Sequence, residues 1–290
     1  MKVRFSLLLL AAGATAVSLA AASPARAAVI ISDNFSANPN VANLAGTTPD
    51  VADLPGGTWS VSSGTTAQTD GASNSTYYGI PSPLAFIWNN GNNAPATSAD
   101  NGAATISLAS NGTYVEPTQL RISADLYTSP AGRTTATAGP SGLMIGFYGT
   151  TPATSTSGNS MAGFSGLVVD NAGNVTLVND GTVGPTVAYT GTYTSTVYNP
   201  LSYDVNTTTG AISDVSLAGN TNYNFTSAAF TNANYAAIGV TAPDTNSNGG
   251  VENFTVQTTQ PAAAPEPATV AVAGMGVALL LLSRKRRKLV

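Results

Sequence analysis

The sequence predicts an all-β protein whose main domain is an antiparallel β-sandwich, or jelly roll. Three observations point to this fold class. Short apolar stretches, most of them alternating with polar residues, recur between positions 29 and 256, as in strands with one buried face. Gly, Asn and Asp, which favour turns, separate these stretches. No segment of the body carries apolar residues at helical spacing, and strands about ten to fifteen residues apart suggest a sandwich.

The expected strands follow one another along the body of the chain. They are predicted at 29–31, 104–108, 120–126, 143–148, 167–169, 175–177, 201–205, 236–240 and 254–256. Asp170-Asn171-Ala172-Gly173-Asn174 predicts a hairpin between the fifth and sixth strands, and 206–210 predicts a turn after the seventh. The segments 38–57 and 151–162 are rich in Pro, Gly, Ser and Thr, so we expect loops there.

The first 27 residues have the pattern of a secretory signal peptide with its expected helix. Two basic residues stand within the first four positions, and an apolar stretch follows at 5–22. Ala25 and Ala27 then form an A-x-A site, which predicts cleavage by signal peptidase before Ala28. A permanent N-terminal anchor is the alternative, although it would not need such a site.

The C-terminus has three parts. The motif Pro265-Glu266-Pro267 is followed by an apolar stretch at 268–283, long enough for a helix of roughly 24 Å, which can span a locally thinned bilayer. The last part is a basic cluster of Arg284, Lys285, Arg286, Arg287 and Lys288. These bases should stay on the cytoplasmic side, so the sandwich domain at 28–256 and the linker at 257–264 should lie outside. An ordinary, retained membrane anchor is the alternative.

This tripartite tail resembles the PEP-CTERM sorting signal of Gram-negative bacteria that make exopolysaccharide. The resemblance covers about 25 of the 290 residues, namely 265–290. It implies an exosortase, a membrane cysteine protease-transpeptidase, as the processing partner. The protein would be held in the inner membrane by its C-terminal helix before processing, and would then reach the cell surface or the extracellular matrix.

The composition excludes several functions. The chain has no Cys and no His, which removes Ser-His-Asp and Cys-His catalysis and His- or Cys-ligated zinc. Between 28 and 264 there is no Lys, and thirteen acidic residues against two arginines give a net charge of −11. Such a domain offers nothing to neutralise phosphates, so nucleic acid is excluded as a partner.

Glycoside hydrolysis needs only two carboxylates, but the body holds just two glutamates, Glu116 and Glu252, far apart in sequence. Asp125 stands on an expected strand without an acidic residue two positions on. The sequence therefore predicts a protein that is not an enzyme and has no required cofactor.

One segment is a candidate calcium site. Asp244, Asn246 and Asn248, followed by a glycine, match the first six positions of a D-x-N-x-N-G loop, in which alternate oxygens converge on one cation. The twelfth position is Thr255 instead of Glu, so Glu252 would have to complete the site. A polar hairpin loop of the same composition is the alternative.

Aromatic residues beside polar loops are candidates for stacking on sugar rings. We selected Trp88, Tyr77 and Tyr78 as the candidate carbohydrate-binding residues. Tyr127 and Tyr148 are weaker candidates. Trp59 is expected in the core, which is also the alternative for Trp88.

The order of elements resembles the concanavalin A-like lectin/glucanase (LamG-type) jelly roll. Asp33-Asn34-Phe35 with Trp59 is similar to its entry strand, 122–127 with 146–148 to its central pair, and 235–240 with 249–256 to its closing strands. The resemblance implies fold, not function. We expect a non-catalytic surface or matrix protein that contacts exopolysaccharide. A calcium-dependent lectin is the alternative, and a glucanase-like enzyme comes third.

Overall fold

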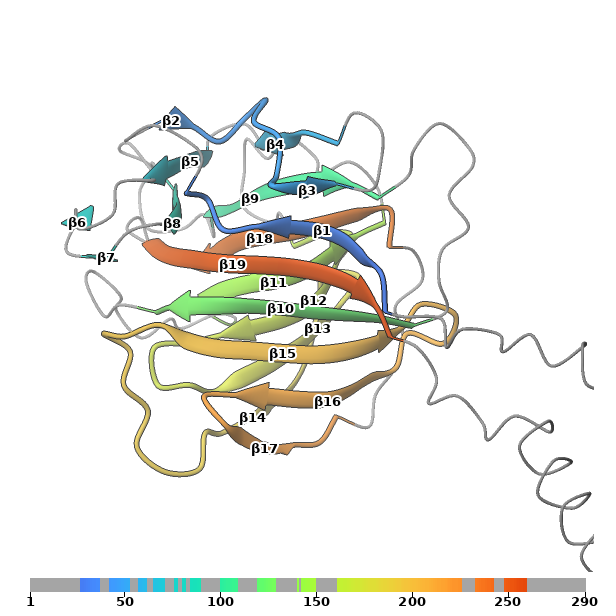
Figure 1. The fold of residues 1–290 in the computed structure, drawn as a ribbon. Helices are drawn as coiled ribbons and strands as arrows, with labels where there is room; N and C mark the ends of the chain where they lie inside the picture. Colours follow the sequence, from blue (N-terminus) through green and yellow to red (C-terminus); the bar gives the residue numbers. More distant parts are fainter. Residues whose placement is uncertain are drawn as a thin grey trace, which may run out of the picture. The chain divides into compact units, whose positions relative to one another are not determined.

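The computed structural model describes residues 27–36, 42–52, 57–61, 65–70, 76–77, 80–81, 84–89, 100–108, 119–128, 140, 142–149, 161–225, 233–242 and 248–259. Residues 28–259 form one compact unit. It is an all-β, two-sheet antiparallel sandwich (Figure 1), consistent with the expected jelly roll. The predicted signal peptide, apart from Ala27, and the predicted sorting tail lie outside the described residues. None of the described residues belongs to a helix with the length and apolarity needed to cross a bilayer.

The first sheet contains both ends of the unit. Its strands are β1 (Val29–Asp33), β2 (Ala42–Asn43), β3 (Val51–Ala52), β5 (Thr65–Asp70), β8 (Leu84–Asn89), β10 (Gln119–Tyr127), β15 (Asn199–Asn206), β16 (Ile212–Leu217), β17 (Asn220–Tyr223) and β19 (Asn248–Thr258). Their order is β17-β16-β15-β10-β19-β8-β5-β2, with β1 between β19 and β3.

The second sheet packs behind the first. Its strands are β4 (Trp59–Val61), β9 (Asp100–Ser107), β11 (Gly142–Tyr148), β12 (Phe164–Val169), β13 (Val175–Asn179), β14 (Thr182–Val187) and β18 (Tyr235–Ala242). Their order is β14-β13-β12-β11-β18-β9-β4. A separate pair joins β6 (Thr76–Tyr77) to β7 (Ile80–Pro81).

The nine predicted strands and the two predicted turns are confirmed. The Asp170–Asn174 hairpin joins β12 to β13, and Asn206 opens the turn before β16 by accepting hydrogen bonds from the backbone of Thr208 and Thr209. Two differences stand out. The expected loop at 38–57 contains the short strands β2 and β3, and β19 runs to Thr258, two residues into the expected linker, because its last residues still pair with β1 and β10.

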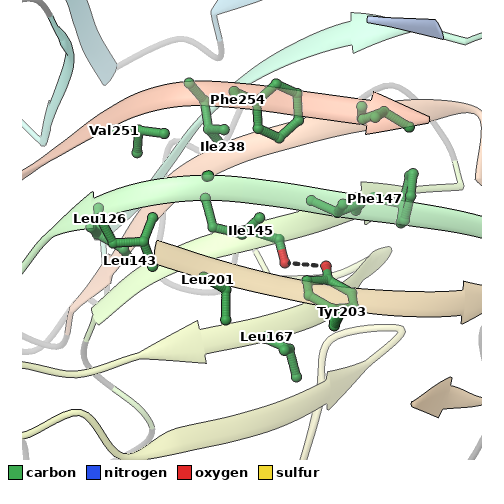
Figure 2. Packing of buried hydrophobic residues seen from close by; sticks show 14 of the residues in the cluster. Leu126, Leu143, Ile145, Phe147, Leu167, Leu201, Tyr203, Ile238, Val251 and Phe254 are labelled. Atoms are coloured by element: carbon green, nitrogen blue, oxygen red, sulfur yellow. Dashed lines mark hydrogen bonds between the residues drawn. The ribbon is translucent and has the colours of Figure 1, made fainter. Parts of the chain in front are cut away.

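The core lies between the two sheets (Figure 2). Alternate residues of β11, namely Leu143, Ile145 and Phe147, face it and are fully buried. Tyr203 on β15 reaches across the core, where its hydroxyl donates a 2.7 Å hydrogen bond to the carbonyl oxygen of Ile145. Burial raises the pKa of Tyr203, so it stays a neutral donor that ties the two sheets together.

A second polar link joins the sheets at β1 and β4. The Asp33 carboxylate accepts a 2.8 Å hydrogen bond from the indole nitrogen of Trp59 and a 2.7 Å bond from the backbone N–H of Phe35. The Trp59 ring lies between those of Phe35 and Phe254, at centroid distances of 6.0 and 5.7 Å. Trp59 is 1% exposed, which confirms its predicted place in the core.

The second sheet is also buried on its outward face. Met144, Tyr148, Phe164 and Val168, which alternate with the core residues, form a second apolar cluster. The strands β11 and β12 therefore read as continuous buried runs, a pattern that strands covered on both faces produce.

Candidate functional site

Five tyrosines gather at one end of the sandwich, which we call the tyrosine end: Tyr127, Tyr189, Tyr193, Tyr198 and Tyr223. Here β10 ends and β15 begins, and Leu126 pairs with Asn199. The hairpin between β12 and β13 lies at the same end, as does the loop at 188–198 between β14 and β15.

The tyrosine rings contact one another in pairs. Tyr189 and Tyr193 meet edge to face with centroids 5.2 Å apart, and Tyr127 and Tyr198 do the same at 5.7 Å. The hydroxyl of Tyr193 is also 3.1 Å from that of Thr128, which follows β10 directly. The loop from the second sheet is thereby fixed to the first sheet.

The Asp170–Asn174 hairpin packs against the rings of Tyr189 and Tyr193. One Asp170 oxygen accepts hydrogen bonds from the backbone N–H groups of Ala172 and Asn174, at 2.8 and 2.9 Å. This arrangement sets Gly173 at a φ of 78°, where a Cβ atom would lie 2.6 Å from the Tyr193 ring. Glycine is required here both for the turn and for the close approach of that ring.

Tyr223 completes the support. Its hydroxyl donates a 3.1 Å hydrogen bond to the carbonyl oxygen of Gly173. Burial raises the pKa of Tyr223, and the neighbouring tyrosines and Asp170 raise it further. It therefore remains protonated, as a donor must.

The loop at 188–198 leaves much of its surface open to solvent. Tyr189, Tyr193 and Tyr198 are half-buried, and most residues between them, chiefly threonines, are exposed. Val197 is 48% exposed. Aromatic rings with an apolar body and a polar tip, next to free hydroxyls, can stack on a sugar ring and bond to its hydroxyl groups.

The predicted carbohydrate-binding residues are only partly described. Trp88 is in β8, where it is the backbone partner of Asn248, and Tyr77 is in β6. Their side chains, and Tyr78 altogether, lie outside the described residues. Since Gly250, two residues after Asn248, pairs with Tyr127, the backbone of Trp88 belongs to the tyrosine end. Tyr148, a weaker candidate, is buried.

Two of the four predicted calcium residues, Asn248 and Glu252, lie on β19. Asp244 and Asn246 lie outside the described residues, and Asn248 begins the strand. Glu252 lies four residues farther along, about 13 Å for an extended strand, and is paired with Asp125 on β10. Burial, and then the charge of Asp125, raise the pKa of Glu252. The described residues contain no group of three His, Cys, Asp or Glu side chains that could hold a metal ion, and the calcium site stays a prediction.

The other predicted sites fall mostly outside the described residues. These are Ala25 of the cleavage site, the motif at 265–267 and the basic cluster at 284–288. Ala27 and Ala28 are exposed. The backbone N–H of Ala28 donates to the hydroxyl of Thr258, so the folded unit begins at the predicted cleavage point.

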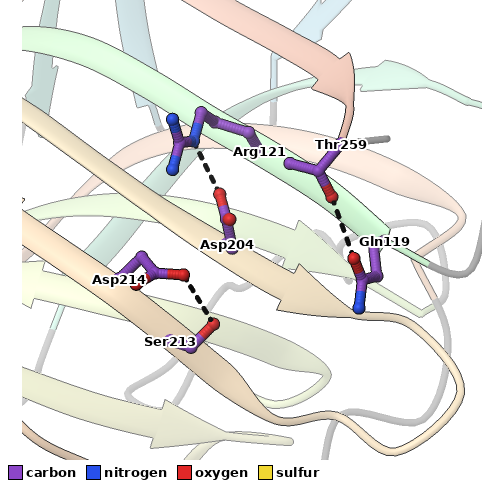
Figure 3. Close-up of polar contacts among 6 residues, drawn as sticks. All are labelled: Gln119, Arg121, Asp204, Ser213, Asp214 and Thr259. Carbon is purple, nitrogen blue, oxygen red and sulfur yellow. Dashed lines mark hydrogen bonds and ion pairs between the residues drawn. The ribbon is translucent and has the colours of Figure 1, made fainter. Parts of the chain in front are cut away.

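Arg121 is the single arginine among the described residues, and it has a partner. Its Nε atom is 2.6 Å from Asp204, its cross-strand neighbour (Figure 3). Ser213 and Asp214 on β16 extend this polar surface of the first sheet. Arg121 lies six residues before Tyr127 on β10, so the tyrosine end has no cation among its described residues.

Sequence reasoning missed Tyr189, Tyr193 and Tyr198. The signal was the repeated tyrosine within a segment of Thr, Gly and Ser at 188–198. The tyrosines of this segment are not spaced as in a strand or a helix. Only the fold shows that Thr128 and Gly173 lie beside Tyr193.

No family model matches the chain, and no curated protein matches it. Among solved structures it is similar to the CBM22-1 xylan-binding domain of Xyn10C from Paenibacillus barcinonensis, with 10% identity over 82% of this chain and 99% of that one and a TM-score of 0.34. It is also similar to the carbohydrate recognition domain of Emp46p in its potassium-bound form, with 13% identity, coverages of 77% and 97% and a TM-score of 0.41. A third is the exoplasmic/lumenal domain of VIP36 bound to Ca²⁺ and Man3GlcNAc, with 10% identity, coverages of 73% and 87% and a TM-score of 0.37. At these identities and TM-scores, the likenesses assign the chain to no family.

Proposed function

We propose that this protein is a non-catalytic, exported carbohydrate-binding protein that uses the tyrosine end as its binding surface. The observation that carries the proposal is the set of half-buried rings of Tyr189, Tyr193 and Tyr198 on a loop of exposed threonines. Aromatic faces supply apolar contact at a low cost in conformational entropy, because a tyrosine side chain has only two rotatable angles to fix. The hydroxyl groups beside them match the polar rim of a sugar.

Export and display form the second part of the proposal. The signal peptide with cleavage before Ala28, and the PEP-CTERM-like tail with its Pro265-Glu266-Pro267 motif, support sorting by an exosortase to the cell surface or matrix. Exopolysaccharide is then the carbohydrate that the protein would meet at the cell surface or in the matrix. The finding of the tagged protein in the same cell fraction with and without the sorting protease would contradict this part.

Binding by the purified chain to an array of polysaccharides tests the first part. We expect Tyr189→Ala and Tyr193→Ala to weaken binding by about tenfold each, as for aromatic contacts at the centre of an interface. Tyr235→Ala is the matched control, because Tyr235 begins β18 at the opposite end of the sandwich. Equal binding by all three variants would refute the assignment to the tyrosine end.

Calcium dependence is the narrower alternative within this proposal. Asn248, one of the predicted calcium residues, stands two residues before Gly250, which pairs with Tyr127 at the tyrosine end. Loss of binding in EDTA, restored by calcium and abolished by Asp244→Ala, would establish it. Unchanged binding in EDTA would leave a calcium-independent carbohydrate-binding protein.

A further inference from the structure

We infer that the tyrosine end takes glycans that carry free ammonium groups, such as polymers containing unacetylated amino sugars. This inference rests on the proposed carbohydrate-binding function and names its ligand class. It follows from the charges around the tyrosines, from the absence of a nearby cation among the described residues, and from the chemistry of the aromatic rings.

The charges come first. The segment 28–264 carries a net charge of −11, and the described arginine, Arg121, is bound to Asp204. Arg121 lies six residues before Tyr127 on β10, about 20 Å along an extended strand. That distance exceeds the screening length of about 8 Å at physiological ionic strength. Arg121 therefore does not offset the negative field at the tyrosine end.

Carboxylates flank the tyrosines on two sides. Asp170 opens the hairpin beneath Tyr193 and is close enough to raise the pKa of Tyr223. Asp125 stands two residues before Tyr127, opposite Glu252 on β19. The repulsion within this second pair is relieved when a positive charge approaches. An anionic glycan would meet repulsion from both sides.

The rings favour the same class of ligand. A cation over the face of an aromatic ring is attracted by its negative π-electron density. Tyr189 and Tyr193 meet edge to face and are half-buried, so part of each ring stays open to a ligand. An acetylated amino sugar keeps the stacking contact but loses the attraction to the rings and to the carboxylates.

Calorimetric titration of the full-length chain in detergent tests the inference with matched probes. These are a glucosamine oligomer, the N-acetylglucosamine oligomer of equal length, and an oligogalacturonate. We expect the glucosamine oligomer to bind about tenfold more tightly than its acetylated counterpart, with a preference that shrinks as salt is added. The oligogalacturonate should not bind.

Two variants locate the effect. Tyr189→Phe keeps the aromatic face and should keep the preference, whereas Tyr189→Leu should lose most of it, with thermal unfolding as the check on folding. Equal affinity for the free and acetylated oligomers would overturn this inference and leave the proposed function standing. Absence of binding to any glycan, including those on the array, would overturn both.

Discussion

Replacement of Asp33 by asparagine should remove a defined part of the pH dependence of stability. Asp33 is 2% exposed and accepts hydrogen bonds from Trp59 and Phe35. Burial nevertheless dominates these bonds and, with a smaller contribution from Asp50, raises the pKa of Asp33 from 3.8 to about 6. Above about pH 6 the Asp33 carboxylate is therefore charged in a buried environment that favours the neutral acid.

The sign follows from the protons bound in each state. The folded protein keeps the Asp33 proton up to about pH 6, whereas the unfolded chain releases it near 3.8. Between these values the folded state holds more protons, so the free energy of unfolding falls as pH rises and stays lower above the window. At about 1.4 kcal/mol for each pKa unit, the loss amounts to about 2–3 kcal/mol.

Urea unfolding from about pH 4 to about pH 7 measures this contribution. The chain has two tryptophans, so a Trp88→Phe background leaves Trp59, which contacts Asp33, as the fluorescent reporter. Asp33→Asn removes one carboxyl group and leaves the rest of the chain unchanged, so the difference between wild type and this variant reports the contribution of Asp33. That difference should fall by about 2–3 kcal/mol across the range. Parallel curves, or a difference that grows with pH, would refute the reasoning.

Two further predictions concern the backbone of the sheets. Gly146→Ala should lower the free energy of unfolding by about 3 kcal/mol, because the new Cβ would overlap the carbonyl oxygen of Ser165 and lie 2.8 Å from the Cα of Gly166. Gly219 has a φ of 80°, but no atom lies near its Cβ position, so Gly219→Ala should lower the free energy of unfolding by only about 1 kcal/mol. Equal losses for the Gly146 and Gly219 variants in urea unfolding would contradict this steric account. Ala218 and Gly219 form the two-residue turn between β16 and β17, and Ala218 has a φ of 51°. Because Asn-Gly suits such a turn, Ala218→Asn should raise the free energy of unfolding by about 0.5–1 kcal/mol. An unchanged or lower unfolding midpoint would count against it.

The strands that sequence could predict carry an apolar pattern that follows their burial, alternating where one face is buried and continuous in β11 and β12, which are buried on both faces. In β10 and β15 every second residue is buried, and the alternation in the sequence is the direct trace of that burial. In contrast, β14 was missed because it is an exposed edge strand that includes Gly184 and Pro185. Its residues have no core to face, so no apolar period marks it, and the proline blocks further pairing at this edge.

The candidate site was harder to predict for a different reason. The position of Trp88 beside a polar loop predicts a stacking residue, but the tyrosine end is assembled from segments that only the fold brings together. Tyr193 meets Thr128 across 65 residues of chain, and Tyr223 meets Gly173 across 50. A spacing of tyrosines within one loop contains no information about such partners. The register of Trp88 with Asn248 is likewise a property of sheet order, which depends on the whole chain.

The contacts beneath the tyrosines bear on how strongly the site can bind. Association loses free energy when loops and side chains must be ordered on contact. Here Asp170 and Gly173 already fix the hairpin, and Tyr193 is already joined to the first sheet through Thr128. The polar groups that hold the loop are thus engaged before a ligand arrives, and the open parts of the half-buried rings and the exposed threonines are left to contact it. A carbohydrate would therefore meet a surface arranged in advance, which lowers the free energy lost on binding.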